Sequence, residues 1–369
     1  MIEKNIKAMY VHIPFCSSIC SYCDFCKQFY DENLVNKYLF SLEKEIDSRY
    51  NKDKLSTIYI GGGTPSCLSV DQLNKLFSIL GVLNLESNYE FTIEVNVNDI
   101  EEDKLKLFKK AGVNRISIGV ETVNEKFASF LNREINYDLI LGKINLVKKY
   151  FDNINIDLMY GFFGEEYEDL DRDLSFIKMI DVSHVSIYSL IIEEHTKLYI
   201  DKVASIDEEK EANMYYRIVN YLKDIGYKHY EISNFAKEGC LSRHNITYWN
   251  NEEYYGVGLG ASGYVNGVRY TNTRNINSYL MGKYVFAEEI IDRRTSMENE
   301  MILGLRKIEG VNKKCFFEKY GYYIEQIFDI IDLLDRKLLM DNNVYLFIPE
   351  DKLYISNSIL VNFIGGSNG

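Results

Sequence analysis

Six short apolar segments alternate with longer amphipathic segments in the first half of the chain, and this alternation constrains the fold most strongly. Such an alternation is typical of parallel strands connected by helices. We therefore predict an α/β fold that forms a complete or partial barrel, with a doubly wound open sheet as the competing arrangement. The expected strands cover residues 9–13, 56–60, 91–95, 115–120, 155–160 and 184–190. The expected helices cover residues 33–50, 70–80, 101–112, 137–150 and 165–180.

The rhythm of the chain changes from about residue 247. Residues 256–272 are rich in glycine and aromatic residues, which predicts a hairpin with loops. A helical stretch at 298–310 is followed at 323–348 by a helix, a turn and a strand, as in a small winged-helix unit. We predict a barrel domain at 1–245, a connecting hairpin and loop region at 246–295, and a C-terminal domain at 296–369.

The charge and the hydropathy pattern limit the partners of the chain. A formal net charge of -13 argues against a nucleic-acid partner, because a phosphate backbone is held mainly by lysine and arginine. No apolar run is long enough to span a membrane, and residues 1–10 lack the apolar block of a secretory signal. We expect a cytoplasmic protein that binds a small molecule or a protein, and peripheral membrane contact stays open.

Four cysteines close to the N-terminus predict a metal centre. Cys16, Cys20, Cys23 and Cys26 have the spacing C-x3-C-x2-C-x2-C. Thiolates that lie close in sequence are typical of iron–sulfur clusters, whereas structural zinc usually takes two separated pairs. Zinc and metal-free thiols are the weaker alternatives. The four thiolates could form a closed cage, or three could hold a cluster whose fourth iron stays open to a ligand.

Glycines and acidic residues stand at the ends of the other expected strands. The sequence GGGTPS at 61–66 follows the second strand, and Glu94, Glu121 and Asp157 lie late in the next three. Because catalytic groups of parallel barrels gather at the carboxyl edge, we expect these residues to share one site with the cysteines. The glycines lack the Lys-Ser/Thr of a phosphate-binding loop, and a tight strand-to-helix turn is their alternative explanation.

The segment YVHIPFCSSICSYCDF resembles the signature of the radical S-adenosylmethionine (SAM) family, in the branch of oxygen-independent coproporphyrinogen III oxidase (HemN) and the heme chaperone HemW. GGGTPS, RISIGVET, NIDLMYG, LGLRKIEGV and SNSILVNF resemble later blocks of this branch, in the same order. The resemblance implies a TIM-like partial barrel of six strand–helix units and a small C-terminal HemN-type domain. It also implies a [4Fe–4S] cluster on Cys16, Cys20 and Cys23, with SAM on the fourth iron and a 5′-deoxyadenosyl radical as the product of its reductive cleavage.

The same resemblance implies a set of cofactor-binding residues. Taken singly, Arg133 could equally form an ion pair at the barrel rim, and His12 could have a structural role. No residue receives a catalytic role. The positions that match SAM-contacting or cluster-shielding positions of the family are Tyr10, Phe25, Gly62, Gly63, Thr64, Glu94, Glu121, Arg133 and Asp157.

His244 opens the sequence HNITYW, which resembles an element that is tied to heme binding in HemW-type proteins. Histidine is a common axial ligand of heme iron. The alternative is a histidine that is satisfied by a hydrogen bond beside Trp249. Covalent heme attachment is not expected, because the sequence C-x-x-C-H does not occur.

The chain departs from the family pattern at several positions. Glu121 stands where the branch usually has glutamine, which adds negative charge beside a cationic cofactor. GFFGE replaces Gly-Leu-Pro-Gly-Gln, TIEVNV lacks a proline, and IEEHT lacks a Pro-Gly turn. Cys26 lies one position later than the extra cysteine of HemN.

These features give one leading hypothesis for the function. CDF and HNITYW favour a HemW-like protein that binds heme and delivers it to client proteins, with client and electron donor unidentified. The alternatives are an oxygen-independent coproporphyrinogen III oxidase of porphyrin biosynthesis, a HemN-like radical SAM methyltransferase, and a closed four-cysteine electron-transfer protein. Whether the chain is an enzyme stays open.

Overall fold

The computed structural model describes residues 5–133 and 135–365. Residues 1–4, which belong to the segment assessed above for a secretory signal, lie outside this range. The chain divides into two compact units, and both are discontinuous in sequence. The first runs to Met214 and resumes at Glu253–Glu289, whereas the second comprises Tyr215–Glu252 and the chain from Ile290 onward. The domain boundaries expected from sequence stay a prediction.

The first unit is built on a sheet of parallel strands. Its strands are β1 (Ala8–Ile13), β4 (Lys54–Gly62), β5 (Asn84–Asn96), β6 (Arg115–Glu121), β7 (Asn153–Tyr160), β8 (His184–Ser189) and β11 (Tyr255–Val257). Neighbours in the sheet follow the order β11-β1-β4-β5-β6-β7-β8. A doubly wound sheet reverses its strand order at a switch point, and no reversal occurs between β1 and β8. The six predicted strands are confirmed, and their order is that of a partial barrel.

The two faces of this sheet differ in polarity, because successive side chains of a strand point to opposite sides. On the apolar face, Phe91 of β5 contacts Phe77 of the preceding helix, with ring centroids 6.3 Å apart. The opposite face carries polar side chains on neighbouring strands, since Ser117 pairs with Asn155 in the strand register. This polar face leads up to the carboxyl ends of the strands. Its side chains are Thr57, Tyr59, Thr92, Glu94, Arg115, Ser117, Asn155, Asp157, His184 and Ser186.

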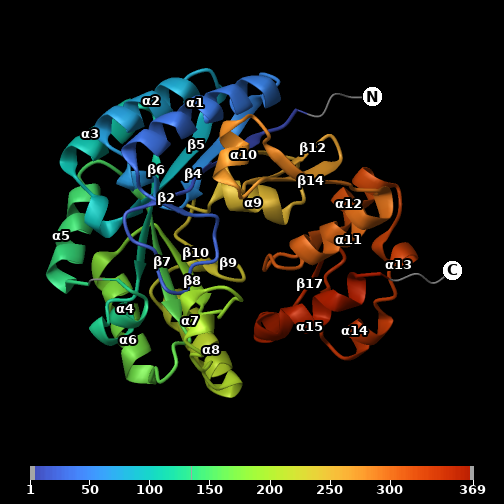
Figure 1. The fold of residues 1–369 in the computed structure, drawn as a ribbon. Coiled ribbons are helices and arrows are strands. Elements are labelled where there is room, and N and C mark those ends of the chain that lie inside the picture. Colours follow the sequence, from blue (N-terminus) through green and yellow to red (C-terminus); the bar gives the residue numbers. More distant parts are fainter. Residues whose placement is uncertain (1–4, 134, 366–369) are drawn as a thin grey trace. The chain divides into compact units, whose positions relative to one another are not determined.

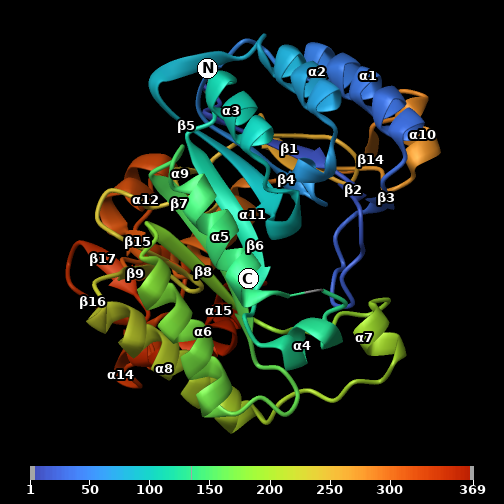
Figure 2. The same cartoon turned by 90° about the vertical axis from the view of Figure 1, so that its left-hand side faces the viewer.

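Five helices connect the strands, as the amphipathic segments predict. They are α1 (Glu32–Arg49), α2 (Val70–Leu80), α3 (Glu102–Lys110), α5 (Tyr137–Val147) and α6 (Tyr167–Ile180). Figures 1 and 2 show them on the outer side of the strands. The start of α1 is fixed by Asp31, whose carboxylate accepts the backbone N–H of Leu34 at 2.8 Å. Ser69 and Gln72 form a capping box at the start of α2.

A hairpin follows β11, as expected for residues 256–272. It consists of the antiparallel strands β12 (Ser262–Val265) and β13 (Val268–Asn272), and β14 (Val285–Ile290) is the third strand of this small sheet. The short helix α10 (Ile276–Leu280) lies between β13 and β14. Through β11, which pairs with β1, this late part of the chain belongs to the first unit.

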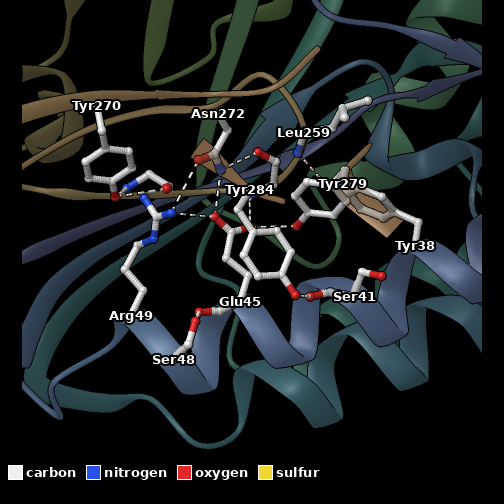
Figure 3. Close-up of polar contacts among 12 residues, drawn as sticks. Tyr38, Ser41, Glu45, Ser48, Arg49, Leu259, Tyr270, Asn272, Tyr279 and Tyr284 are labelled. Carbon is white, nitrogen blue, oxygen red and sulfur yellow. Dashed lines mark hydrogen bonds and ion pairs between the residues drawn. The ribbon is translucent and has the colours of Figure 1, made fainter. Parts of the chain in front are cut away.

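The hairpin region is joined to α1 by a buried polar network around Glu45, drawn in Figure 3. The fully buried Glu45 carboxylate accepts hydrogen bonds from Asn272 Nδ2 at 2.6 Å and the hydroxyl of Tyr279 at 2.6 Å. It also accepts the backbone N–H of Gly258 at 2.8 Å. Arg49 supplies the countercharge at 3.4 Å from Glu45. No local pattern in the sequence indicates this network.

The second unit combines short helices with small sheets. Its first segment holds the hairpin of β9 (Lys228–Glu231) and β10 (Asn234–Ala236), followed by α9 (Arg243–Trp249). Its second segment holds α11 (Arg293–Gly304), α12 (Lys313–Tyr320), α13 (Ile324–Ile327), α14 (Ile331–Asp335), α15 (Ser356–Leu360) and the sheet of β15 (Val311–Asn312), β17 (Tyr345–Phe347) and β16 (Met340–Asp341). Across the described part of the chain, every helix is too short or too polar to cross a membrane.

Candidate functional site

The carboxyl ends of the parallel strands surround a cavity of about 510 Å³ in the first unit. Cys16, Cys20 and Cys23 all line it, and their thiols form no disulfide. The hydroxyl of Thr64 lies 3.6 Å from Cys16 Sγ, so the GGGT turn after β4 meets the cysteine loop directly. Three thiols at one cavity are a donor set that suits an iron–sulfur cluster.

Cys26 does not share this position. It is absent from the lining of the cavity, and its side chain lies against the hairpin region of the first unit. A Cβ placed on Gly260 would come within 2.9 Å of Cys26 Sγ, so only glycine leaves room there. On the same side, Arg274 donates a hydrogen bond to the carbonyl of Asp24 at 2.5 Å. The structure thus divides the four cysteines into three at the cavity and one packed behind the loop.

His12 fixes the cysteine loop from behind. Its Nε2 lies 2.8 Å from the carbonyl oxygen of Cys26 and its Nδ1 lies 2.9 Å from the hydroxyl of Tyr10. Because a carbonyl only accepts, Nε2 carries the proton and Nδ1 accepts from Tyr10. Burial lowers the pKa of His12 to about 4, so the imidazole is neutral. Gly62 has a φ of +116°, and a Cβ at this position would lie 2.3 Å from the imidazole of His12. The glycine therefore leaves the space that the His12 side chain occupies.

Two carboxylates, one on β5 and one on β7, line the cavity from either side of β6. Glu94 accepts hydrogen bonds from the backbone N–H of Gly62 at 3.0 Å and from the hydroxyl of Tyr59 at 2.9 Å. Burial, with the charge of Asp157 as a smaller contribution, raises the pKa of Glu94 to about 7. Burial also raises the pKa of Asp157, which accepts from Ser117 at 2.9 Å. A cationic ligand would stabilise the charged form of both carboxylates.

Glu121 and Arg133 form an ion pair at the same cavity, with 3.2 Å between Arg133 Nη1 and Glu121 Oε1. Arg133 Nη1 also lies 3.6 Å from Cys20 Sγ, and its Nη2 donates to the carbonyl of Gly119 at 2.7 Å. Burial raises the pKa of Glu121, and the charge of Arg133 opposes this rise. Arg133 therefore contacts both the thiol of Cys20 and the acidic residue that stands where the family usually has glutamine.

The charge of the cavity is unbalanced. Its lining contains five acidic residues and two basic residues, namely Asp24, Glu94, Glu121, Asp157 and Glu193 against Lys27 and Arg133. Deprotonation of the three thiols that line the cavity would add further negative charge. A ligand with positive charge is therefore favoured at this cavity on electrostatic grounds.

Most of the residues predicted from sequence are brought together here, and a few are not. Phe25, Gly62 and Gly63 line the cavity, whereas Tyr10 does not, although its ring lies 6.2 Å from that of Tyr59, which does. The sequence pattern did not indicate six further lining residues, of which four lie in strands and two, Tyr22 and Ile191, lie in loops. These are Tyr22, Tyr59, Ser117, Met159, Tyr188 and Ile191. The period of two within each strand would have identified Tyr59 and Ser117 as neighbours of Glu94.

His244 belongs to the second unit, on α9. It is buried, and its Nε2 lies 2.7 Å from the hydroxyl of Tyr248, one helical turn later. This hydrogen bond is of the kind expected for a satisfied histidine, although the partner is Tyr248 and not the neighbouring Trp249. Coordination of an iron by Nε2 would require the hydroxyl of Tyr248 to move away.

Comparisons with known proteins agree with this geometry. Residues 10–177 match the model of the radical SAM superfamily. The chain is 38% identical over 375 residues to the heme chaperone HemW of Lactococcus lactis, covering 99% of this chain and 98% of that protein. It is 37% identical to the heme chaperone HemW of Bacillus subtilis, covering 98% of this chain and 100% of that protein. The structure of coproporphyrinogen III oxidase (HemN) from Escherichia coli matches with a TM-score of 0.86 at 20% identity, over 98% of this chain and 90% of that one, which shows a shared fold.

Proposed function

We propose, because this chain belongs to the HemW family within the radical SAM superfamily, that it is a cytoplasmic protein that binds heme and delivers it to client proteins. The observation that carries the proposal is the near-complete coverage of two heme chaperones at 37–38% identity. The alternatives of a coproporphyrinogen oxidase and a methyltransferase have less support, since the likeness to HemN is one of fold at 20% identity.

The radical SAM family implies a [4Fe–4S] cluster and SAM, and the residues of the cavity fit both groups. Cys16, Cys20 and Cys23 would hold the cluster, while Cys26 would support the loop through the hairpin region. When bound, the two groups supply one-electron chemistry. The chain itself contributes the position of its thiols, the exclusion of water from the strand ends and a surplus of carboxylates.

Individual residues would divide the binding of SAM among them. The half-buried carboxylate of Glu94, held by Gly62 and Tyr59, suits the ammonium group of the cofactor. Asp157, held by Ser117, would accept hydroxyl donors of the ribose. Arg133 would face the carboxylate of the cofactor while Glu121 keeps its guanidinium in place. Phe25 is exposed by 66% at the mouth of the cavity, which suits a shield that orders when the cofactor is bound.

As a further step of the proposal, His244 on α9 would bind the heme iron through its imidazole. The hydroxyl of Tyr248 and a heme iron would compete for Nε2 of His244. The imidazole can therefore form the hydrogen bond to Tyr248 or bind the iron, but not both at once. Such a competition suits a carrier that must release its heme again, because the hydroxyl offers the imidazole a replacement partner.

Heme titration followed by the Soret band tests the proposal. We expect the wild type to bind heme, His244→Ala to lose at least about tenfold in affinity through the missing axial ligand, and Tyr248→Phe to bind at least as tightly as the wild type. His195→Asn is the matched control, because His195 is exposed and its φ of +69° is tolerated by asparagine. Equal, weak binding by all four proteins would reject the proposal, as would formation of protoporphyrinogen from coproporphyrinogen.

A further inference from the structure

Arg306 follows the end of α11 in the second unit and lies beside Trp249, the last residue of α9. Its guanidinium carbon is 6.0 Å from the centroid of the Trp249 ring. The backbone fixes this position, because the carbonyl of Arg306 accepts the N–H of Ile232 at 3.2 Å. Tyr230 and Ile308 are joined by a further backbone hydrogen bond of 3.1 Å. Arg306 is thus a turn residue held against the β9–β10 hairpin, beside the last residue of the helix that carries His244.

The guanidinium of Arg306 has few partners for its charge. It donates one side-chain hydrogen bond, from Nη2 to Asn357 Oδ1 at 3.0 Å, and the acceptor is neutral. Within residues 5–133 and 135–365, no carboxylate oxygen lies within ion-pair distance of it. Burial lowers the pKa of Arg306, and the charge of Glu231 opposes this shift.

The neighbouring Glu231 does not fill this role. It is buried, and burial raises its pKa to about 7, so its negative charge is incomplete at neutral pH. Its Oε1 atom is buried without a hydrogen bond in the described part of the chain. The buried indole N–H of Trp249 likewise has no acceptor among those residues. A cation and an indole donor on adjacent side chains therefore lack an acidic acceptor.

We propose that Arg306, with Trp249 beside it, binds one propionate carboxylate of the heme that α9 receives. A guanidinium presents planar paired donors that match a carboxylate, and an Arg–carboxylate pair is stronger than a neutral hydrogen bond. Heme carries two such carboxylates on one edge of an apolar ring. This inference rests on the proposed heme binding and adds the group that fixes the orientation of the ring. Asn357 then holds the guanidinium, and Trp249 covers one of its faces.

Paired titrations with heme and with heme dimethyl ester, whose propionates are esterified, test this inference on the full chain in one detergent buffer. Arg306→Gln keeps a donor for Asn357 but removes the charge. We expect it to bind heme about 10-fold to 100-fold more weakly than the wild type does, from the loss of a charge-assisted hydrogen bond. The ester should bind the wild type and Arg306→Gln with equal affinity.

Two further variants separate recognition of the carboxylate from general damage to the fold. Arg306→Lys keeps the charge without the paired donors and should fall between the wild type and Arg306→Gln in heme affinity. Arg336→Gln is the matched control, because Arg336 lies in the same unit and its side chain is 63% exposed. It should leave heme affinity unchanged.

The outcomes distinguish this inference from the proposed function. Suppose that heme binding depends on His244, but that Arg306→Gln lowers the affinity for heme and for the ester equally, or changes neither affinity. The propionate site is then wrong, while the proposed heme binding stands. If the wild type binds no heme, both fall together. Discrimination between heme and ester that disappears only in the Arg306 variants supports the assignment.

Discussion

Two groups of carboxylates in the first unit differ in how their charge is balanced. Glu45 is surrounded by four donors from the chain itself, namely Gly258, Asn272, Tyr279 and the guanidinium of Arg49. At the cavity, acidic residues outnumber basic ones. Burial raises the pKa of both Glu45 and Glu94, but the charge of Arg49 opposes this rise at Glu45, whereas the charge of Asp157 adds to it at Glu94. A carboxylate that the chain satisfies completely holds the fold together, whereas one that the chain leaves incomplete marks a place for a ligand.

The largest expected effect concerns the cysteines of the cavity. Cys16→Ser, Cys20→Ser and Cys23→Ser should each lose the cluster and all reductive cleavage of SAM, because a four-iron cluster needs these thiolates. Iron content and release of 5′-deoxyadenosine after anaerobic reconstitution measure both losses. Cys26→Ser is the matched control and should keep cluster and cleavage, since Cys26 packs against Gly260 outside the cavity. Equal losses in all four variants would mean that the cavity is a closed four-cysteine cage.

The next largest effect concerns Glu45, the carboxylate whose partners all come from the chain itself. Glu45→Ala should lower the free energy of unfolding by about 3–5 kcal/mol, because removing one partner leaves buried donors and the charge of Arg49 uncompensated. Urea unfolding followed by circular dichroism measures the loss. Glu43→Ala, on the same helix, is the control and should cost no more than about 0.5 kcal/mol, since its pair with Lys75 is exposed. Similar losses in both variants would show that the network around Glu45 contributes nothing special.

A smaller effect concerns Glu94 at the cavity and the pH dependence of SAM binding. Glu94 has a raised pKa of about 7, so it is mostly neutral at pH 6 and mostly charged at pH 7.5. The charged form attracts the ammonium group of SAM, so the KM for SAM should fall about eightfold between these pH values. The free energy of unfolding should change in the opposite sense. Because the pKa of Glu94 is raised in the folded state, its contribution to stability falls as the pH rises from about 4.5 to about 7.

Glu94→Gln is the control for that profile. Its KM for SAM should be high and should not change between pH 6 and pH 7.5, because the amide does not titrate. A wild-type KM that is constant over this range, or a variant that keeps the wild-type slope, would assign the titration to another group.

The smallest effect concerns the departure from the family at Glu121. Glu121→Gln should change the KM for SAM by less than about threefold, because an amide oxygen can still accept from Arg133 at the same position. Glu125→Gln, at the exposed start of the short helix Glu125–Phe130, is the control with no expected change. A tenfold change in Glu121→Gln alone would show that the extra negative charge is part of cofactor binding.

The sequence predicts the regular part of this protein well, for identifiable reasons. The period of two in strands such as 115–120 and the period of helices such as 70–80 are local, and the structure confirms β6 and α2 at nearly the same bounds. Residues at strand ends also converge predictably, because neighbouring parallel strands end at the same edge. Glu94 and Asp157 were found in this way.

What the sequence did not predict depends on contacts between distant segments. Glu45 lies in an amphipathic helix, where a charged residue is ordinarily solvated, and only the approach of Asn272 and Tyr279 makes it a buried centre. The same holds for Arg306, because only the folded chain shows that its guanidinium lies beside Trp249 and forms no ion pair within the described residues. No local pattern carries this information.

The pairing of β11 with β1 has a consequence for the biosynthesis of the chain. Strand β1 is synthesised well before its neighbour at 255–257, which follows the first segment of the second unit along the chain. Until then, β1 presents an unpaired edge that can join another chain. A truncation after residue 245 would make this state permanent, so we expect such a fragment to aggregate and the first unit to mature only when residue 289 has emerged.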